Sequence, residues 1–178
     1  MRGYCRHWEF LLHKVLEVSV EIKVGMADMN VCCSPDSIIT LGLGSCVGAV
    51  LYDPVTKICG MVHVMLPDST TISNNSNVAK FADTGVEALL QMVLKKGAKR
   101  ERLVAKIAGG AQMFSVNKNA PMLKVGERNV EAVKKKLKEL NIRLIAEDTG
   151  ENYGRTVIFY PETGEYLIRA IGKEPTTI

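Results

Sequence analysis

The sequence predicts an α+β fold, an α/β/β layered sandwich in which two packed β-sheets carry two main helices on one outer face. Only two stretches show helical periodicity, whereas many short apolar segments between turn residues are typical of strands. Two helices cannot cover both faces of so many strands, so the strands must form sheets that cover one another. A chain of 178 residues, 47% of them hydrophobic, is long enough for one domain with a substantial core.

The first residues look separate from this domain. Residues 1–19 mix charged and apolar side chains without the clean apolar stretch of a signal peptide, so we interpret them as a peripheral N-terminal extension. Residues 20–178 are expected to form a single domain. The chain contains no run of 18 apolar residues, which predicts that it does not insert into a membrane.

The N-terminal half is expected to consist mostly of strands. A first strand with its loop falls within residues 21–30, and a second strand covers residues 37–41. Two apolar runs then flank Asp53-Pro54, which is a turn signal because proline pre-sets the backbone angle that a turn needs. These runs predict a hairpin, and the polar residues 68–77 predict a loop after it.

The C-terminal half is expected to alternate helices and strands. Apolar residues at every third or fourth position predict one helix over 78–96, with Gly97 just past its end, and another over 127–140. The other apolar segments predict strands, the last two of them joined by a turn at 161–164. These strands cover residues 103–108, 142–146, 155–160 and 165–170.

Cys46 and His63 occupy the two strands of the predicted hairpin. If its loop is residues 53–56, Tyr52 faces Lys57 and Cys46 lies directly opposite His63. Directly opposed residues point to the same face of a sheet, with Cβ atoms roughly 4.5–5.5 Å apart. A loop of another length would shift this pairing.

A thiol beside an imidazole suits nucleophilic catalysis. Cysteine attacks as the thiolate, and histidine accepts the proton and later returns it to the leaving group. We therefore expect an ion pair that lowers the pKa of Cys46, and acyl transfer through a thioester. The glycine-rich residues before the cysteine predict a loop close to the substrate, with Gly44 and Ser45 as candidate donors to an oxyanion.

Other interpretations of these residues stay open. A buried cysteine is usually an inert hydrophobe, and a histidine in an apolar strand is usually a packed core residue. The glycines also suggest a phosphate loop, but they lead into a strand and miss the dinucleotide spacing. Ser45 does not fit a nucleophile elbow, because Leu43 and Val47 occupy the required glycine positions.

Composition limits the partners and cofactors. A net charge of +4 is too small for a nucleic-acid footprint. The five cysteines are odd in number, contain no C-x-x-C pair and form no zinc pattern with the three histidines. We therefore expect no bound metal, and free thiols that predict a cytoplasmic protein.

Six segments together resemble a known family. They are TLGLGSCVGAVLYDP (40–54), HVMLPDS (63–69), KFADTGVEAL (80–89), KIAGGAQMF (106–114), GERNVEAVKKKL (126–137) and IAEDTGENYGRTV (145–157). From about Glu21 to about Ile171 the chain resembles the bacterial chemoreceptor glutamine deamidases, the CheD family. The resemblance implies the same layered fold and catalytic roles for Cys46, His63 and Thr40, the last of which would orient the histidine.

The resemblance also implies a substrate and partners. The substrate is a glutamine side chain on the helical cytoplasmic region of a methyl-accepting chemotaxis receptor, and some members also hydrolyse glutamyl methyl esters. No cofactor is implied, a CheC-type phosphatase is an implied partner, and we expect a monomer. The alternative is a non-catalytic regulator that binds the receptor or such a phosphatase.

Three further sets of residues are ambiguous. Gly110 and Gln112 are candidates for shaping the substrate cleft, although paired glycines after a strand are more often plain turns. Met113 and Phe114 would grip a receptor helix or pack in the core. Asp68 would act as a triad acid or, in the simpler interpretation, stabilise a turn.

Overall fold

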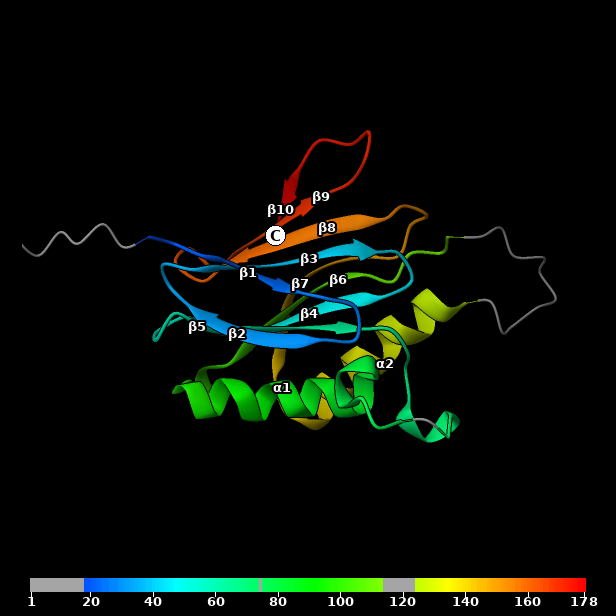
Figure 1. The fold of residues 1–178 in the computed structure, drawn as a ribbon, viewed down its shortest axis with the longest axis horizontal. Coiled ribbons are helices and arrows are strands. Elements are labelled where there is room, and N and C mark those ends of the chain that lie inside the picture. The colour runs from blue at the N-terminus through cyan, green and yellow to red at the C-terminus, as the bar shows by residue number, and fades with distance from the viewer. Residues whose placement is uncertain (1–17, 74, 114–123) are drawn as a thin grey trace, which may run out of the picture.

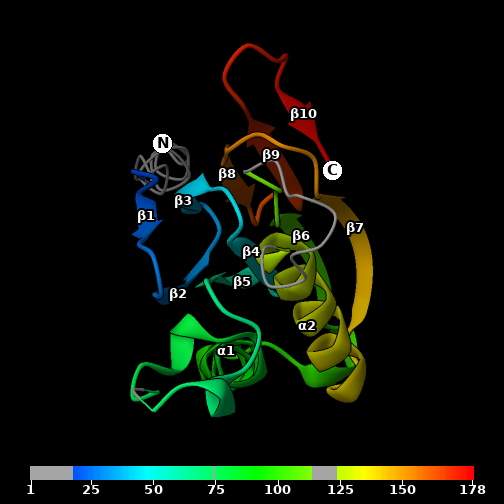
Figure 2. The same ribbon diagram turned by 90° about the vertical axis from the view of Figure 1, so that its right-hand side faces the viewer.

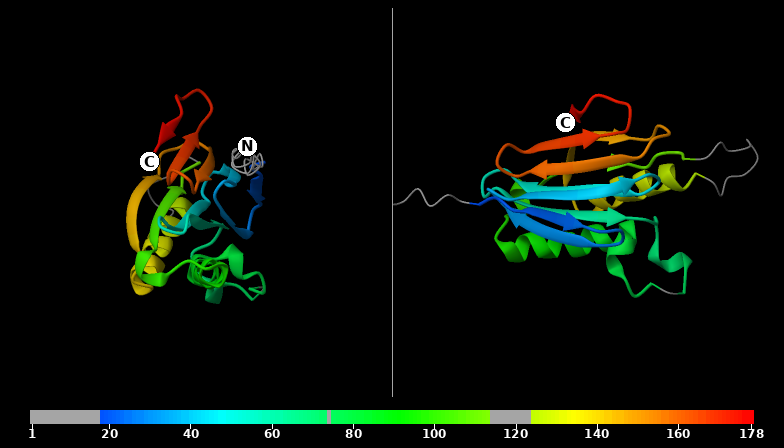
Figure 3. Two further views of the ribbon diagram at one scale, coloured as in Figure 1. Left: turned by 90° about the vertical axis from the view of Figure 1, so that its left-hand side faces the viewer. Right: turned by 45° about the horizontal axis from the view of Figure 1, so that its top comes forward.

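Two β-sheets lie face to face, and two α-helices cover one side of the pair, in the computed structural model, which describes residues 18–73, 75–113 and 124–178 (Figure 1). The views in Figure 2 and Figure 3 show the same layers from other sides. We name the sheet that contacts the helices the inner sheet and the other one the outer sheet. This arrangement confirms the predicted α/β/β layering.

The inner sheet has the strand order β2-β5-β4-β6-β7, in which only β6 and β7 are parallel neighbours. Every residue of β4 and β5 is buried, because the helices cover one face of these central strands and the outer sheet covers the other. The strands are β2 (Met29–Cys33), β4 (Val47–Asp53), β5 (Ile58–Val64), β6 (Val104–Gly109) and β7 (Arg143–Thr149).

The outer sheet has the order β1-β3-β8-β9-β10, and β1 runs parallel to β3. Aromatic rings fill the space between the two sheets: Phe159 makes edge-to-face contacts with Tyr52 and Tyr166, at centroid distances of 5.0 and 6.0 Å. The strands are β1 (Glu21–Val24), β3 (Ser37–Leu43), β8 (Arg155–Tyr160), β9 (Glu165–Arg169) and β10 (Thr176–Thr177).

The helices α1 (Ala82–Lys96) and α2 (Val125–Glu139) pack their apolar faces on the inner sheet (Figure 2). Full burial of a valine or leucine side chain contributes about 1.5–3 kcal/mol, so these faces dominate the packing. Gly97 ends α1 in a left-handed conformation, as predicted. The segment before α1 contains the short 3-10 helices η1 (Ser69–Thr71) and η2 (Val78–Lys80), and a third, η3 (Arg100–Arg102), follows it.

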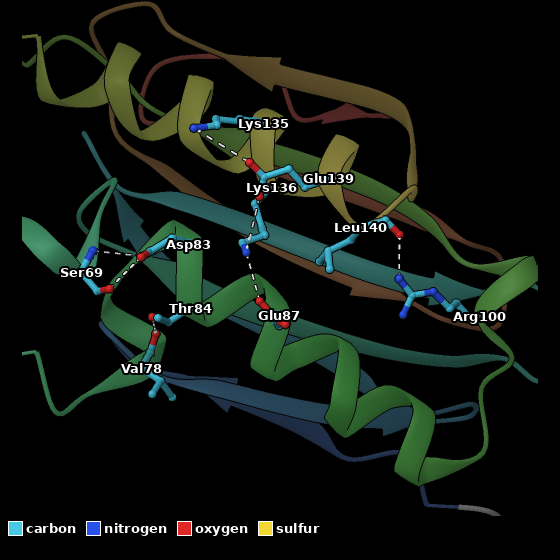
Figure 4. A network of polar contacts seen from close by, with 10 residues as sticks. All are labelled: Ser69, Val78, Asp83, Thr84, Glu87, Arg100, Lys135, Lys136, Glu139 and Leu140. Carbon is cyan, nitrogen blue, oxygen red and sulfur yellow. Dashed lines mark hydrogen bonds and ion pairs between the residues drawn. The ribbon is translucent and has the colours of Figure 1, made fainter.

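Polar contacts join the exposed sides of the two helices (Figure 4). Lys136 of α2 forms an ion pair with Glu87 of α1 at 3.0 Å, and Arg100 donates to the carbonyl oxygen of Leu140 at 3.0 Å. Exposed ion pairs contribute at most about 1 kcal/mol each, so these contacts add little to the apolar packing.

Several strands differ from the prediction: β7 extends to Thr149, and β10 was not predicted. β2 lies partly inside the region predicted as a first strand with its loop, and β3 extends to Leu43. The hairpin loop is residues 54–57, because Asp53 still belongs to β4 and pairs with Ile58.

The Asp53 carboxylate is held in this position by Arg102, at 2.6 Å, and by the backbone N–H of Val55. Burial alone would raise the pKa of Asp53, but these hydrogen bonds and one from the Lys99 backbone lower it.

The predicted extension over residues 1–19 lies almost wholly outside the described residues, so it and the single domain over 20–178 stay predictions. Among the helices of the described ranges, none is long and apolar enough to cross a membrane.

Candidate active site

The C-terminal ends of β3 and β5 and the beginning of β4 meet at one end of the sandwich, on the side where α2 begins (Figure 1). Thr40 lies on β3, His63 near the end of β5, and Cys46 immediately before β4. Thr40 and His63 are fully buried, whereas Cys46 is partly exposed. All three residues predicted to be catalytic are therefore at the same end of the molecule.

The pairing of Cys46 with His63 differs from the prediction. Gly48, and not Cys46, lies directly opposite His63, because the hairpin loop begins one residue later than expected. Alternate residues of a strand share a face, and Cys46 packs against the buried cluster between the two sheets, which includes Met61 of β5. Cys46 is thus a diagonal neighbour of His63, a relationship that typically separates residues by roughly 7–8 Å.

The hydrogen bonds of Thr40 fix which nitrogen of His63 carries a proton. The Thr40 hydroxyl donates its one proton to the carbonyl oxygen of Val24, 2.8 Å away. The 2.7 Å bond between Thr40 Oγ1 and His63 Nδ1 must therefore be donated by the ring. In the neutral imidazole, Nε2 then carries the lone pair and is the basic atom. His63 Nε2 is buried and has no hydrogen-bond partner within the described part of the chain.

Burial favours the neutral form of both candidate catalytic groups. Desolvation lowers the pKa of His63 and raises the pKa of Cys46. The expectation that an ion pair lowers the pKa of Cys46 is therefore wrong for this structure. The thiol must instead pass its proton to His63 as it attacks, and such catalytic hydrogen bonds are often long without substrate and tighten when it binds.

Three successive carbonyl oxygens around Cys46 accept hydrogen bonds. That of Gly44 accepts from the Ala111 N–H and that of Cys46 from the Gly110 N–H, both at 2.8 Å. Between them, the carbonyl oxygen of Ser45 accepts from the side-chain amide of Asn129 on α2, at 2.9 Å. We name residues 44–46 the nucleophile loop. Its carbonyls all point into the protein, and its position is fixed from two directions.

The glycine pair after β6 is required for this contact. Gly109 and Gly110 have φ of 111° and 68°, which favours glycine. A Cβ on Gly109 would overlap the carbonyl oxygen of Cys46, and one on Gly110 would overlap the side chain of Val130. Gly110 thus holds the nucleophile loop, and neither of its earlier interpretations, a plain turn or a cleft-shaping residue, described that role.

The other predicted loop residues differ in what they offer. The Gly44 N–H already donates to the carbonyl oxygen of Gly42 at 2.9 Å, so Gly44 is a poor oxyanion donor and its proposed role is corrected. The backbone N–H of Gln112 donates to Glu151 at 2.7 Å, which ties this segment to the loop after β7. A pocket of about 500 Å³ next to this contact is lined by Gly110 and Gln112.

An exposed apolar side chain, that of Met113, lies beside the nucleophile loop. Met113 is 46% exposed and its side chain lies against Gly44, while Leu41, next to Thr40, is 53% exposed. Core packing is therefore excluded for Met113, and the apolar surface beside Cys46 fits contact with another protein. Phe114 lies outside the described residues.

Two other candidates have structural explanations. Asp68 caps η1 by accepting from Thr70 at 2.7 Å, so turn chemistry and not a triad explains it. Cys32 and Cys59 are buried, directly opposed on β2 and β5, with sulfur atoms 3.3 Å apart. Over the described ranges, no three His, Cys, Asp or Glu side chains gather as they would around a metal ion.

Sequence reasoning missed Asn129. Its side-chain amide binds the carbonyl oxygens of both Ser45 and Met65, each at 2.9 Å. A signal was available, because Asn129, Val133 and Leu137 recur at every fourth position and so share one helix face. An asparagine on an otherwise apolar, buried face needs an explanation.

Comparison with known proteins identifies the family. The family model described as CheD chemotactic sensory transduction matches residues 65–170. A probable chemoreceptor glutamine deamidase of Lachnoclostridium phytofermentans is 67% identical over 152 residues, which cover 85% of this chain and 94% of the relative. The chain belongs to the CheD family. The corresponding protein of Caldanaerobacter subterraneus is 57% identical over 151 residues, covering 85% and 93%, and the chemoreceptor glutamine deamidase of Halalkalibacterium halodurans is 56% identical over 151, covering 84% and 93%.

The CheD family model begins at residue 65 and so leaves out Cys46 and His63. The whole-chain comparisons include them, because any stretch of 152 residues in a chain of 178 contains the segment from Thr40 to His63. The resemblance stated from the sequence segments is confirmed at the level of the CheD family.

Proposed function

We propose that this chain is a chemoreceptor glutamine deamidase in which Cys46 is the nucleophile, His63 the general base and Thr40 the group that orients His63. The relatives named above support the reaction. The observation that carries the assignment of residues is the Thr40–His63 hydrogen bond, which leaves His63 Nε2 as an unpaired base on the same sheet face as Cys46.

The reaction follows from these roles. Cys46 Sγ attacks the carbon of the glutamine side-chain amide while its proton passes to His63 Nε2. The tetrahedral intermediate collapses as His63 returns that proton to the amide nitrogen, and ammonia leaves. A water molecule then loses a proton to His63 Nε2 and attacks the thioester, which releases glutamate and the Cys46 thiol. Hydrolysis of a glutamyl methyl ester would use the same steps with methanol as the leaving group.

The oxyanion of the intermediate needs donors. The backbone N–H groups of Ser45 and Cys46 donate to no acceptor in the described part of the chain, whereas that of Gly44 is occupied. We therefore assign the oxyanion role to Ser45, as expected from the sequence, and to Cys46 in place of Gly44. These two N–H groups beside the nucleophile are the donors we propose for the oxyanion.

The partners follow from the surface. Met113 provides an exposed apolar contact against Gly44, two residues before the partly exposed Cys46, as is needed by an enzyme that takes a side chain from a receptor helix. We propose that the protein acts in the cytoplasm as a monomer, and that a CheC-type phosphatase competes for the same surface. The four cysteines in the described residues are free thiols, which agrees with that compartment.

Mass spectrometry of a receptor's cytoplasmic fragment tests this proposal. Incubation with the wild-type protein should raise the mass of particular glutamine peptides by about one unit, as NH₂ is replaced by OH. Cys46→Ala should leave the receptor unchanged, and Cys33→Ala, which removes a partly exposed thiol on β2, should act like the wild type. Binding of the receptor without any mass change would favour the non-catalytic alternative.

A further inference from the structure

We propose that Asn129 is a positioning residue that holds the nucleophile loop and the histidine strand in their working relationship. It lies on α2 and is fully buried. Its side-chain nitrogen donates to the carbonyl oxygen of Ser45, directly before Cys46, and to that of Met65, two residues after His63. One side chain thus binds the segment that carries Cys46 and the segment that directly follows the strand of His63. This role rests on the proposed function of Cys46 and His63.

These two bonds require a group that can donate two protons. Both partners are carbonyl oxygens, which accept and never donate, so the atom between them must provide two protons. The Asn129 amide group does so, whereas an aspartate of the same shape would place a negative charge against both oxygens. The orientation of the Asn129 side chain is therefore determined by its partners.

The bridge lies where the sheet no longer joins the two strands. The ladder between β4 and β5 ends at the pair Val47 and Val64. Beyond it, the Met65 N–H turns away and donates to the carbonyl oxygen of Lys80. At the step that follows the last ladder pair, where Cys46 would face Met65, Asn129 instead joins the two segments by donating to the carbonyl oxygens of Ser45 and Met65.

This bridge orients Cys46 through its own peptide bond. The peptide joining Ser45 to Cys46 is planar, so a carbonyl oxygen held on one side points the Cys46 N–H to the opposite side. Gly110 and Ala111 hold the carbonyls on either side of it in the same way. Asn129 differs from Gly110 and Ala111 in that it also donates to the carbonyl oxygen of Met65, two residues after His63.

The burial of Asn129 is unfavourable for stability alone. Its Oδ1 is buried without a hydrogen-bond partner among the described residues. An unpaired buried oxygen destabilises a protein, and an apolar residue would suit this helix face better. A position that breaks the local packing rule is expected to serve the site.

The test compares variants of the full chain in steady-state deamidation of a receptor cytoplasmic fragment. Asn129→Ala removes the bridge, and Asn129→Leu removes it while keeping the branched arrangement of heavy atoms in the side chain. Val133→Ala is the matched control, because Val133 is equally buried on the same face of α2 and belongs to the apolar cluster under the inner sheet. Thermal unfolding identifies which variants are folded, and Asn129→Leu remains informative if Asn129→Ala is not.

We expect kcat to fall about 100-fold in both Asn129 variants, the loss that a misplacement of about 1 Å produces. KM should stay within about twofold, because buried Asn129 cannot touch the receptor, and Val133→Ala should keep both constants. The proposal is overturned if kcat of Asn129→Leu equals that of the wild type, if Val133→Ala loses as much, or if KM rises while kcat is unchanged. Cys46→Ala is assayed in parallel: if it remains active, the proposed function has failed, whereas if it is inactive and Asn129→Leu fully active, only the positioning role has.

Discussion

Thr40 Oγ1 and His63 Nδ1 lie 2.7 Å apart, and the hydrogen bond between them is donated by the histidine ring, because the threonine proton is already given to Val24. Thr40 thereby selects the tautomer that leaves Nε2 free, and in the proposed mechanism this is the role that a carboxylate has in other triads. Without a charge, however, it cannot stabilise the imidazolium that forms during the reaction as strongly.

Replacing Thr40 should slow deamidation less than replacing His63. Thr40 only orients the ring, whereas His63 moves the proton, and general base catalysis contributes about 10²–10⁴-fold. We expect Thr40→Ser to keep most of the single-turnover rate, because it retains the hydroxyl, and Thr40→Ala to lose more, yet less than His63→Ala. Equal losses in the two alanine variants would mean that Thr40 does more than orient the ring.

The pH dependence should reflect the burial of His63. Its pKa is below the ordinary histidine value of about 6.5, so kcat/KM should decline only at pH values below that. Stability should also decrease as the pH falls. The unfolded chain takes up the proton first, so stability is lost from about pH 6.5 downward until the pKa of the folded state is reached. If kcat/KM already declines above pH 7 as the pH is lowered, this assignment is contradicted. In thermal unfolding, His63→Gln should remove this pH dependence of stability.

Alkylation should report the pairing of Cys46 with His63. Cys32 and Cys59 are buried and should react slowly, whereas Cys46 and Cys33 are partly exposed. His63→Ala should slow the reaction of Cys46 with iodoacetamide, because the base that takes its proton is lost, and should leave Cys33 unchanged as an internal control. Peptide mapping separates the two sites. If Cys46 and Cys33 both react at wild-type rates in His63→Ala, His63 is not the base that takes the proton of Cys46.

Gly110→Ala should damage both stability and activity. A left-handed conformation costs a residue other than glycine about 1–2 kcal/mol, and overlap with Val130 adds about 1–3 kcal/mol. Gly172→Ala is the matched control, because Gly172 has a φ of 72° and nothing near its Cβ position. Urea unfolding should show only the first cost in Gly172→Ala. Equal stabilities would mean that the contact with Val130 relaxes freely.

The layering could be predicted from the sequence because it depends on coarse patterns, two helical periodicities among many short apolar runs. The register of the hairpin could not, since it depends on Asp53: turn chemistry predicts that Asp53-Pro54 begins the loop, but contacts of the buried Asp53 carboxylate with Arg102 hold Asp53 in the strand. Such contacts join residues far apart in the chain.

The candidate site, like the fold, could be predicted only in part. The shared sheet face of Cys46 and His63 was predicted correctly, because alternation along a strand survives a register shift of two. The bridge by Asn129 and the contact of Gly110 with the carbonyl of Cys46 could not be predicted, since both depend on how α2 packs against the end of the inner sheet.

Trapping the acyl-enzyme tests the central claim most directly. A receptor fragment mixed with the wild-type protein and quenched in acid should yield a covalent adduct on a denaturing gel, joined at Cys46 and cleaved by hydroxylamine as a thioester is. Cys46→Ala should give neither adduct nor deamidation. Full deamidation by Cys46→Ala, or an adduct that maps to another residue, would contradict the account.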